Sequence, residues 1–131
     1  MHTRLSQKEK KYLDQARVGR VSSADGRGRP HVAPLCHAFD ASRRTAYVAT
    51  GGRTSRNLRS RPTAALGCDD YFEEWGRLRG VVAHARARFV RPGAELERAV
   101  RLLKKKYKQY RDYEFDEAIA LDIKRVASWG L

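Results

Sequence analysis

The clearest pattern along the chain is a strict alternation of positions over residues 81–90. One side of this segment carries only apolar residues, and the other carries His84, Arg86 and Arg88 between two valines. Because successive side chains of a strand point to opposite faces, the pattern predicts a strand with one face in the core and the other in contact with water or a cofactor. Five more strands are predicted over residues 17–23, 30–39, 43–50, 63–68 and 118–126.

The segment 63–68 differs from the other predicted strands because it is a nearly unbroken run of small apolar residues. Such a run is typical of a strand that is covered on both faces. We therefore expect it to be central in the sheet.

A short N-terminal helix and one longer helix are predicted from apolar residues at helical spacing. Residues 5–16 form the first, in which Ser6 and Glu9 match a capping box. Residues 96–107 form the second, whose opposite face is basic. The basic positions are Arg101, Lys104, Lys105 and Lys108.

A short third helix is predicted after the strand that ends at Thr50. The glycine pair that follows breaks this strand, and Thr54 or Ser55 can cap a helix. The helix must end near Arg61, because the next residue is a proline.

Together these elements predict a single domain over residues 1–131 that is mainly β (α+β). Six strands with few helices do not follow the strand–helix–strand rhythm of a parallel sheet. A closed antiparallel barrel is the natural architecture for them.

The charge balance is the strongest compositional feature, with 28 Lys and Arg residues against 15 Asp and Glu residues and a net charge of +13. This excess predicts an anionic partner: a nucleic acid, an acidic membrane surface, or a cofactor that carries phosphate. The charges can also simply solvate the surface. No segment is apolar enough to span a membrane and none reads as a signal peptide, so we expect a cytoplasmic protein.

Most familiar catalytic and metal-binding patterns are missing from the sequence. There is no glycine-rich dinucleotide motif, P-loop, HExxH or GxSxG. Cys36 and His37 are neighbours on a predicted strand and point to opposite faces, so they cannot form a nucleophile–base pair. We expect both cysteines, Cys36 and Cys68, to be buried and reduced, and we expect no metal site.

Nucleic-acid binding is a weaker alternative. The basic face of the long helix could follow phosphates, but no recognition motif accompanies it. Trp75 is of more interest, because an aromatic residue in a polar loop can form the wall of a ring-binding pocket.

The segment from Thr50 to Leu58 combines glycines, hydroxyls and arginines at the start of the short helix. Helix N–H groups, Ser or Thr hydroxyls and guanidinium groups each favour a multiply charged phosphate. The segment is therefore either a phosphate-binding turn or an ordinary capped turn.

Seven pieces of sequence stand in a characteristic order, although none is specific alone. They are residues 16–21, 28–35 and 45–50, the turn Ser55-Arg56-Asn57-Leu58-Arg59 followed by Pro62, residues 70–78, Lys106-Tyr107 with Gln109-Tyr110, and Trp129. Their order resembles the pyridoxamine-5'-phosphate-oxidase-like superfamily of FMN- and F-420-binding split β-barrels. Within it, the chain is similar to the small proteins classed as probable coenzyme F-420 (deazaflavin) enzymes.

The resemblance implies a six-stranded antiparallel split β-barrel that forms a homodimer with cofactor sites at the subunit interface. By resemblance, the phosphate-binding turn comprises Arg53, Ser55, Arg56 and Asn57, preceded by Thr50. The strand formed by His31, Val32, Ala33 and Pro34 would line the ring system, with Trp75 as a candidate wall. Arg56 stands where many relatives have Lys. The positive charge is kept, but the planar guanidinium group can donate two parallel hydrogen bonds.

The implied function is that of an oxidoreductase that uses bound F-420 for hydride transfer to a small-molecule substrate. The phosphodiester and oligoglutamate tail of F-420 carry more negative charge than the single phosphate of FMN, so the net charge of the chain favours F-420. Three alternatives stay open: an FMN-binding oxidoreductase, a non-catalytic flavin or haem carrier, and a nucleic-acid-binding module. The sequence names neither a catalytic residue nor the substrate.

Overall fold

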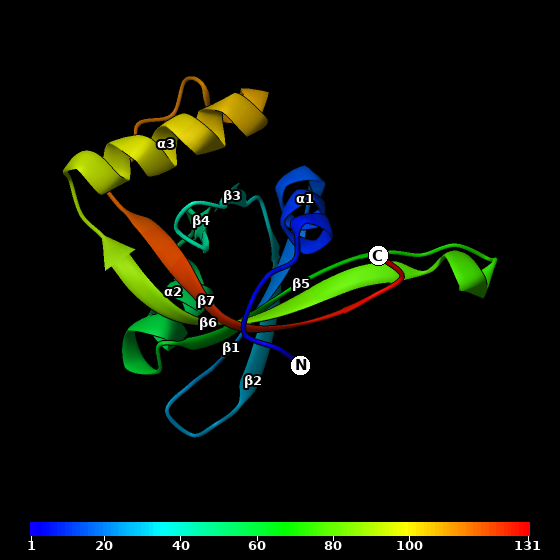
Figure 1. The fold of residues 1–131 in the computed structure, drawn as a ribbon. Helices are drawn as coiled ribbons and strands as arrows, with labels where there is room; N and C mark the ends of the chain where they lie inside the picture. The colour runs from blue at the N-terminus through cyan, green and yellow to red at the C-terminus, as the bar shows by residue number, and fades with distance from the viewer.

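Seven antiparallel strands form one curved sheet with helices around it (Figure 1). The computed structural model describes residues 1–131. The strands are β1 (Gly19–Ala24), β2 (Pro30–Leu35), β3 (Ala38–Asp40), β4 (Thr45–Val48), β5 (Thr63–Asp70), β6 (Arg79–Val90) and β7 (Ala118–Trp129). The helices are α1 (Gln7–Gln15), α2 (Gly52–Ser60) and α3 (Ala94–Lys106), with single 3-10 turns η1 (Trp75–Arg77) and η2 (Lys108–Tyr110). The mainly β class and the three helices are confirmed, and the count of six strands was wrong.

The order of strands across the sheet is β2-β1-β5-β6-β7-β4-β3, so β2 and β3 are its two edges. Only Cys36 and His37 separate these two edge strands along the chain. Because an extended chain advances at most about 3.6 Å per residue, Leu35 and Ala38 lie within about 11 Å of each other. The sheet therefore curls until its edges meet at this end.

The edges meet without pairing, since no ladder hydrogen bonds join β2 to β3. The prediction of a closed barrel is therefore wrong. The chain forms an antiparallel half-barrel that is split between its edge strands, and its main core is a cluster of 18 buried residues.

The extra strand arises because the predicted strand over residues 30–39 breaks at Cys36 and His37. The backbone N–H of His37 donates to the hydroxyl of Tyr107 at 3.0 Å, and the imidazole Nε2 donates to the carbonyl of Leu13 at 2.9 Å. These contacts tie His37 to α1 and to the end of α3 instead of to a neighbouring strand. The chain can therefore leave one edge of the sheet and enter the other.

Helix α1 begins as the sequence predicts. The hydroxyl of Ser6 accepts a hydrogen bond from the backbone N–H of Glu9, and the carboxylate of Glu9 accepts one from the backbone N–H of Ser6. The capping box is therefore confirmed. No helix of the chain is long and apolar enough to cross a membrane.

The small apolar strand β5 lies inside the sheet, between β1 and β6, but only one of its faces is fully covered. Ala64, Leu66 and Cys68 are buried, whereas Ala65 and Gly67 are half-buried. The prediction that both faces are covered is thus wrong for the single chain. Of the two cysteines, Cys68 is buried as expected, but Cys36 is only half-buried, because it lies at the break between the edge strands.

Candidate functional site

Helix α2 begins at Gly52, with Gly51 as its N-cap, so the prediction that Thr54 or Ser55 caps the helix is wrong. Gly52 has a φ of 64°, a conformation that glycine adopts at little cost. This lets the helix start three or four residues earlier than predicted, and Thr54 becomes a buried residue of the first turns.

The first turn of α2 has no side-chain cap and contains no acidic residue. Its backbone N–H groups are therefore available to an external acceptor, and the positive end of the helix dipole is not neutralised locally. Nothing lies within 4 Å of where a Cβ would stand on Gly51 or Gly52, so the space in front of the helix is open.

A polar cavity of about 360 Å³ lies between α2 and the turn that joins β1 to β2. We call it the arginine cavity. It is lined by Asp25, Arg29, Pro30, His31, Arg53, Arg56 and Asn57. Arg53 and Arg56 are exposed, and neither forms an ion pair within the chain. The cavity thus gathers three guanidinium groups beside an uncapped helix N-terminus.

Asp25 is the only acidic residue of the arginine cavity, and its carboxylate is already engaged. It accepts hydrogen bonds from the backbone N–H of Arg29 and from its Nε, and also from the backbone N–H of Arg27. These bonds to Arg29, followed by the one to Arg27, lower the pKa of Asp25 to about 2. Asp25 therefore shapes the turn and orients Arg29.

Asn57 connects α2 to the sheet. Its side chain is 5% exposed, and its Nδ2 donates to the hydroxyl of Ser23 on β1 at 3.2 Å. Leu58, the next residue, is buried in the main core. Together they fix the orientation of the helix, and hence the positions of Arg56, the residue before Asn57, and of Arg53, one turn before it.

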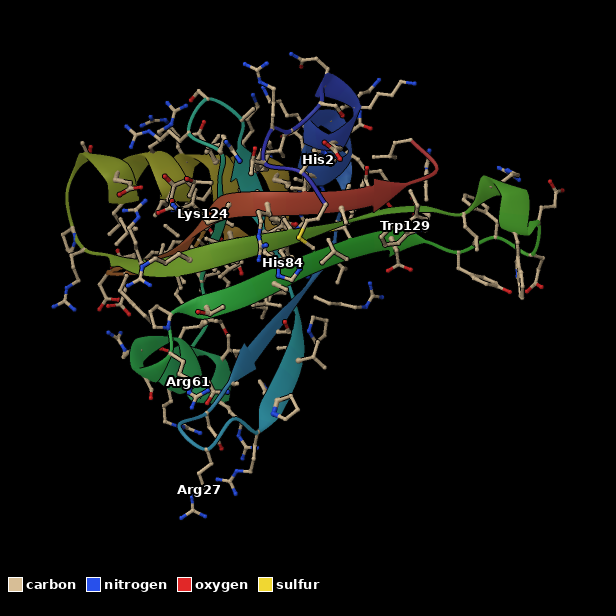
Figure 2. All side chains as sticks on the ribbon, turned by 60° about the horizontal axis from the view of Figure 1, so that its bottom comes forward. His2, Arg27, Arg61, His84, Lys124 and Trp129 are labelled. Atoms are coloured by element: carbon tan, nitrogen blue, oxygen red, sulfur yellow. The ribbon has the colours of Figure 1, made fainter.

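A second and larger hollow, of about 690 Å³, lies where the end of α2 and the start of β5 face the β1–β2 hairpin. We call it the His84 trough. It is lined by residues 22–24, Pro30, residues 60–65 and His84. Figure 2 shows His84 on β6 near the middle of the sheet face, with Arg61 and Arg27 toward the α2 and β1–β2 end. Pro30 lines both hollows, so the arginine cavity and the His84 trough adjoin there.

The sequence profile of the pyridoxamine 5'-phosphate oxidase family matches residues 5–130. The chain belongs to this family. No curated protein matches its sequence.

Solved structures share the fold of this family member at low sequence identity. A conserved hypothetical protein from Mycobacterium tuberculosis is 18% identical, with a TM-score of 0.79 over 98% of this chain and 86% of the other. The heme storage protein HutZ from Vibrio cholerae is 15% identical, with a TM-score of 0.75 over 96% and 94% of the two chains. An FAD-binding protein from Mesorhizobium loti is 24% identical, with a TM-score of 0.72 over 95% and 92%.

The arginine cavity of this family member brings together four of the residues that the sequence singled out: His31, Arg53, Arg56 and Asn57. Thr50 and Ser55 are half-buried nearby but do not line the cavity. The hydroxyl of Thr50 has only a long contact, of 3.5 Å, to the carbonyl of Gly51.

Strand alternation divides the predicted ring-binding strand between two faces of the sheet. His31 and Ala33 lie opposite Ser23 and Val21, on the face that packs toward α2 and the core. Val32 and Pro34 are both exposed on the outer face, where Val32 lies opposite Ser22. The four residues therefore cannot line one face of a single pocket within the chain.

Trp75 does not line the arginine cavity. It lies in η1, at the tip of the β5–β6 hairpin, and its side chain is 73% exposed. Strand β5 separates it from the end of α2, and seven strand steps span about 23 Å. Figure 1 shows η1 at the opposite end of the sheet from α2.

Three lining residues of the arginine cavity were missed from the sequence: Asp25, Arg29 and Pro30. The sequence predicts only a turn over residues 24–28, and no local pattern indicates that this turn faces α2. His84 was missed as a site residue too, although the alternation over residues 81–90 had placed it on the face open to water or a cofactor. No group of three or more His, Cys, Asp or Glu side chains is placed to hold a metal ion.

Proposed function

We propose that this chain is an oxidoreductase that binds a phosphorylated flavin-type cofactor, with F-420 as the preferred cofactor, and transforms a small-molecule substrate. The observation that carries the proposal is the arginine cavity. Arg29, Arg53 and Arg56 line it beside the uncapped N-terminus of α2. Guanidinium groups and helix N–H groups are the donors that bind phosphate in proteins.

The residues of the cavity fit a phosphate in charge and in space. The one carboxylate, on Asp25, is already engaged by Arg29 and Arg27 and so does not neutralise Arg53 or Arg56. The open space in front of Gly51 and Gly52 leaves room for phosphate oxygens. A flavin or deazaflavin, when bound, supplies the hydride-transfer chemistry, and the protein holds and orients it.

The choice of F-420 over FMN rests on further positive charge next to the cavity. Arg27 and Arg61 are exposed, and neither forms an ion pair. Arg61 donates a hydrogen bond to the carbonyl of Gly26, which holds its side chain against the β1–β2 hairpin. These arginines extend the basic surface toward a second anionic group, such as a phosphodiester or a glutamate tail.

A homodimer with the cofactor at its interface is part of the proposal. The outer face of β1, β5, β6 and β7 presents small or apolar side chains that one chain leaves half-covered. They include Ala65, Gly67, Val82 and Ala127, with Val32 61% exposed at the β2 edge. A second copy packed on this face would cover it and close the His84 trough. Sedimentation of Val82→Glu should then show a monomer where the wild type is a dimer; a monomeric wild type would reject the interface site.

The test is to titrate the purified protein with FMN and with F-420, following the visible spectrum at low and high salt. Arg53→Ala combined with Arg56→Ala should weaken binding at least 100-fold, because each charged hydrogen bond contributes about 1.5–3 kcal/mol. The matched control is Arg101→Ala with Lys104→Ala on α3, which removes the same charge away from the cavity and should leave affinity within about twofold.

Each outcome of this titration has a distinct meaning. Tight FMN binding without F-420 binding would reject F-420 in favour of FMN. Binding of neither, with salt-sensitive retention of DNA or RNA, would reject the cofactor proposal altogether. Oxidation of reduced F-420 by an added electrophilic substrate would support an enzyme, whereas binding without turnover would support a carrier.

A haem carrier is the second candidate. HutZ is a heme storage protein, and a heme binding protein from Mycobacterium smegmatis shares the fold at 21% identity, with a TM-score of 0.77 over 97% of this chain and 55% of the other. The observation that favours this candidate is His84, an imidazole with no hydrogen-bond partner in the chain at the edge of a large hollow. Haem titration of the wild type and of His84→Ala would test it: a Soret band that His84→Ala shifts supports the carrier, and an unchanged band removes His84 as a ligand.

A further inference from the structure

The floor of the His84 trough is a row of aligned residues on three neighbouring strands. Ser22 of β1 lies opposite Ala65 of β5, which lies opposite His84 of β6. Neighbouring strands are about 4.8 Å apart, so the row is about 10 Å long. Ser22 and Ala65 rise little above the backbone, and the His84 imidazole stands at the end of the row. This makes a shallow, flat surface with one polar ring at its margin.

The trough adjoins the arginine cavity through a residue that both share. Pro30 is the first residue of β2, and it lines both hollows. A hydrogen bond also links the two hollows: Nδ2 of Asn57, which lines the arginine cavity, donates to the hydroxyl of Ser23, which lines the trough. A ligand whose phosphate lies beside Arg53 and Arg56 can therefore extend past Pro30 onto the trough floor.

We propose that the planar ring of such a ligand lies on the Ser22–Ala65 floor and that His84 contacts its polar edge. This inference rests on the proposed function, because it places the other end of the same ligand. His84 is free for this role, since no group of the chain hydrogen-bonds to its imidazole. Apart from His84, Arg61 is the one Lys, Arg, Asp or Glu residue that lines the trough, and it already donates a hydrogen bond to the carbonyl of Gly26.

The contact would make His84 a specificity residue for the ring. An imidazole can donate a hydrogen bond to a ring carbonyl or accept one from a ring N–H. Rings with such groups on one edge, as in flavins and deazaflavins, gain this contact, and a purely apolar ring does not. Arg53 and Arg56 would then recognise the phosphate, and His84 the ring.

The experiment separates the two ends by using riboflavin, which has the ring without the phosphate, beside FMN. His84→Ala should weaken both ligands by the same factor, about tenfold for one hydrogen bond, and should shift the visible band of the bound ring. His84→Gln, which keeps a donor and an acceptor, should recover part of the affinity. Arg53→Ala with Arg56→Ala should weaken FMN and leave riboflavin unchanged.

Arg86→Ala is the matched control, because Arg86 lies two residues further along β6 on the same face but does not line the trough. Arg86→Ala should bind riboflavin and FMN with the affinities of the wild type, and the visible spectra of the bound ligands should be unchanged. If His84→Ala and His84→Gln leave both ligands unaffected while the arginine variant still loses FMN, the ring lies elsewhere and this inference is overturned, with the proposed function intact. If wild-type protein binds neither FMN nor F-420, the proposed function fails first.

Discussion

Gly80 of β6 lies directly opposite Trp129 of β7, and the indole ring occupies the space that a side chain on Gly80 would need. A Cβ on Gly80 would overlap Cζ2 of Trp129 and would stand 2.8 Å from the carbonyl oxygen of Cys68. Both contacts would be far closer than van der Waals contact. The aromatic ring therefore packs on bare backbone, a pairing that protects glycine within a sheet.

Gly80→Ala should destabilise the protein by about 1–3 kcal/mol, because the indole or the backbone of β5 must move. Gly26→Ala is the control: Gly26 lies in the β1–β2 turn without a positive φ, and the atom nearest to its new Cβ would be Oγ of Ser60 at 3.9 Å. It should change stability by no more than about 0.5 kcal/mol. Urea unfolding measures both effects, and tryptophan fluorescence should change only for Gly80→Ala. Equal losses would mean that the Trp129 contact has no special role.

Local patterns predicted most of the elements because their causes are local. The alternation over residues 81–90 became β6, with Val81, Ala83, Ala85 and Ala87 buried. The Ser6–Glu9 capping box starts α1, since both partners lie within one helical turn. Arg53 and Arg56 were placed at the start of a short helix, and the structure puts them in one cavity there.

What the sequence could not supply depends on contacts between distant residues. The break between β2 and β3 is fixed by Tyr107, 70 positions after His37. The contribution of Arg29 to the arginine cavity depends on how the β1–β2 turn faces α2, which no local pattern encodes. The early start of α2 depends on a positive φ at Gly52, and a side-chain capping rule overlooks that possibility.

Tyr107→Phe should destabilise the protein by about 1–3 kcal/mol. The Tyr107 side chain is buried, and its hydroxyl accepts from the N–H of His37 and lies 2.8 Å from the carbonyl of Arg17. Removing the hydroxyl leaves both backbone groups without this partner. Tyr113→Phe serves as the control, because Tyr113 is 57% exposed and its hydroxyl is unpaired, so the expected change is below about 0.5 kcal/mol. Similar midpoints for the two variants in urea would refute the structural role of Tyr107.

Gly52→Ala should cost about 1 kcal/mol of stability, because alanine disfavours the φ of 64° that starts α2. Gly51→Ala should be nearly neutral, since its φ of −118° suits any residue and no atom lies within 4 Å of the new methyl group. Thermal unfolding of both variants tests this difference. If Gly52→Ala leaves the thermal stability unchanged, α2 can begin without a residue in the left-handed conformation.

The carboxylate of Glu9 should make stability fall in acid. Burial acts to raise the pKa of Glu9, but hydrogen bonds from His2, the backbone N–H of Ser6 and the hydroxyl of Ser128 outweigh it and lower the pKa to about 2. An unfolded glutamate has a pKa of about 4.3, so the unfolded chain binds the proton more readily. The stabilisation is therefore complete above about pH 5 and is lost as the pH falls toward 2.

Glu9→Gln tests this dependence because it removes the titrating group and keeps the shape. The free energy of unfolding at pH 7 should drop by about 1–3 kcal/mol, and the curves of the variant and the wild type should converge between pH 5 and pH 2. Glu97→Gln, at an exposed position of α3, should leave the curve unchanged. If Glu9→Gln keeps the full acid dependence of the wild type, other carboxylates, such as Asp40 with its hydrogen bonds from Arg98, are responsible for it.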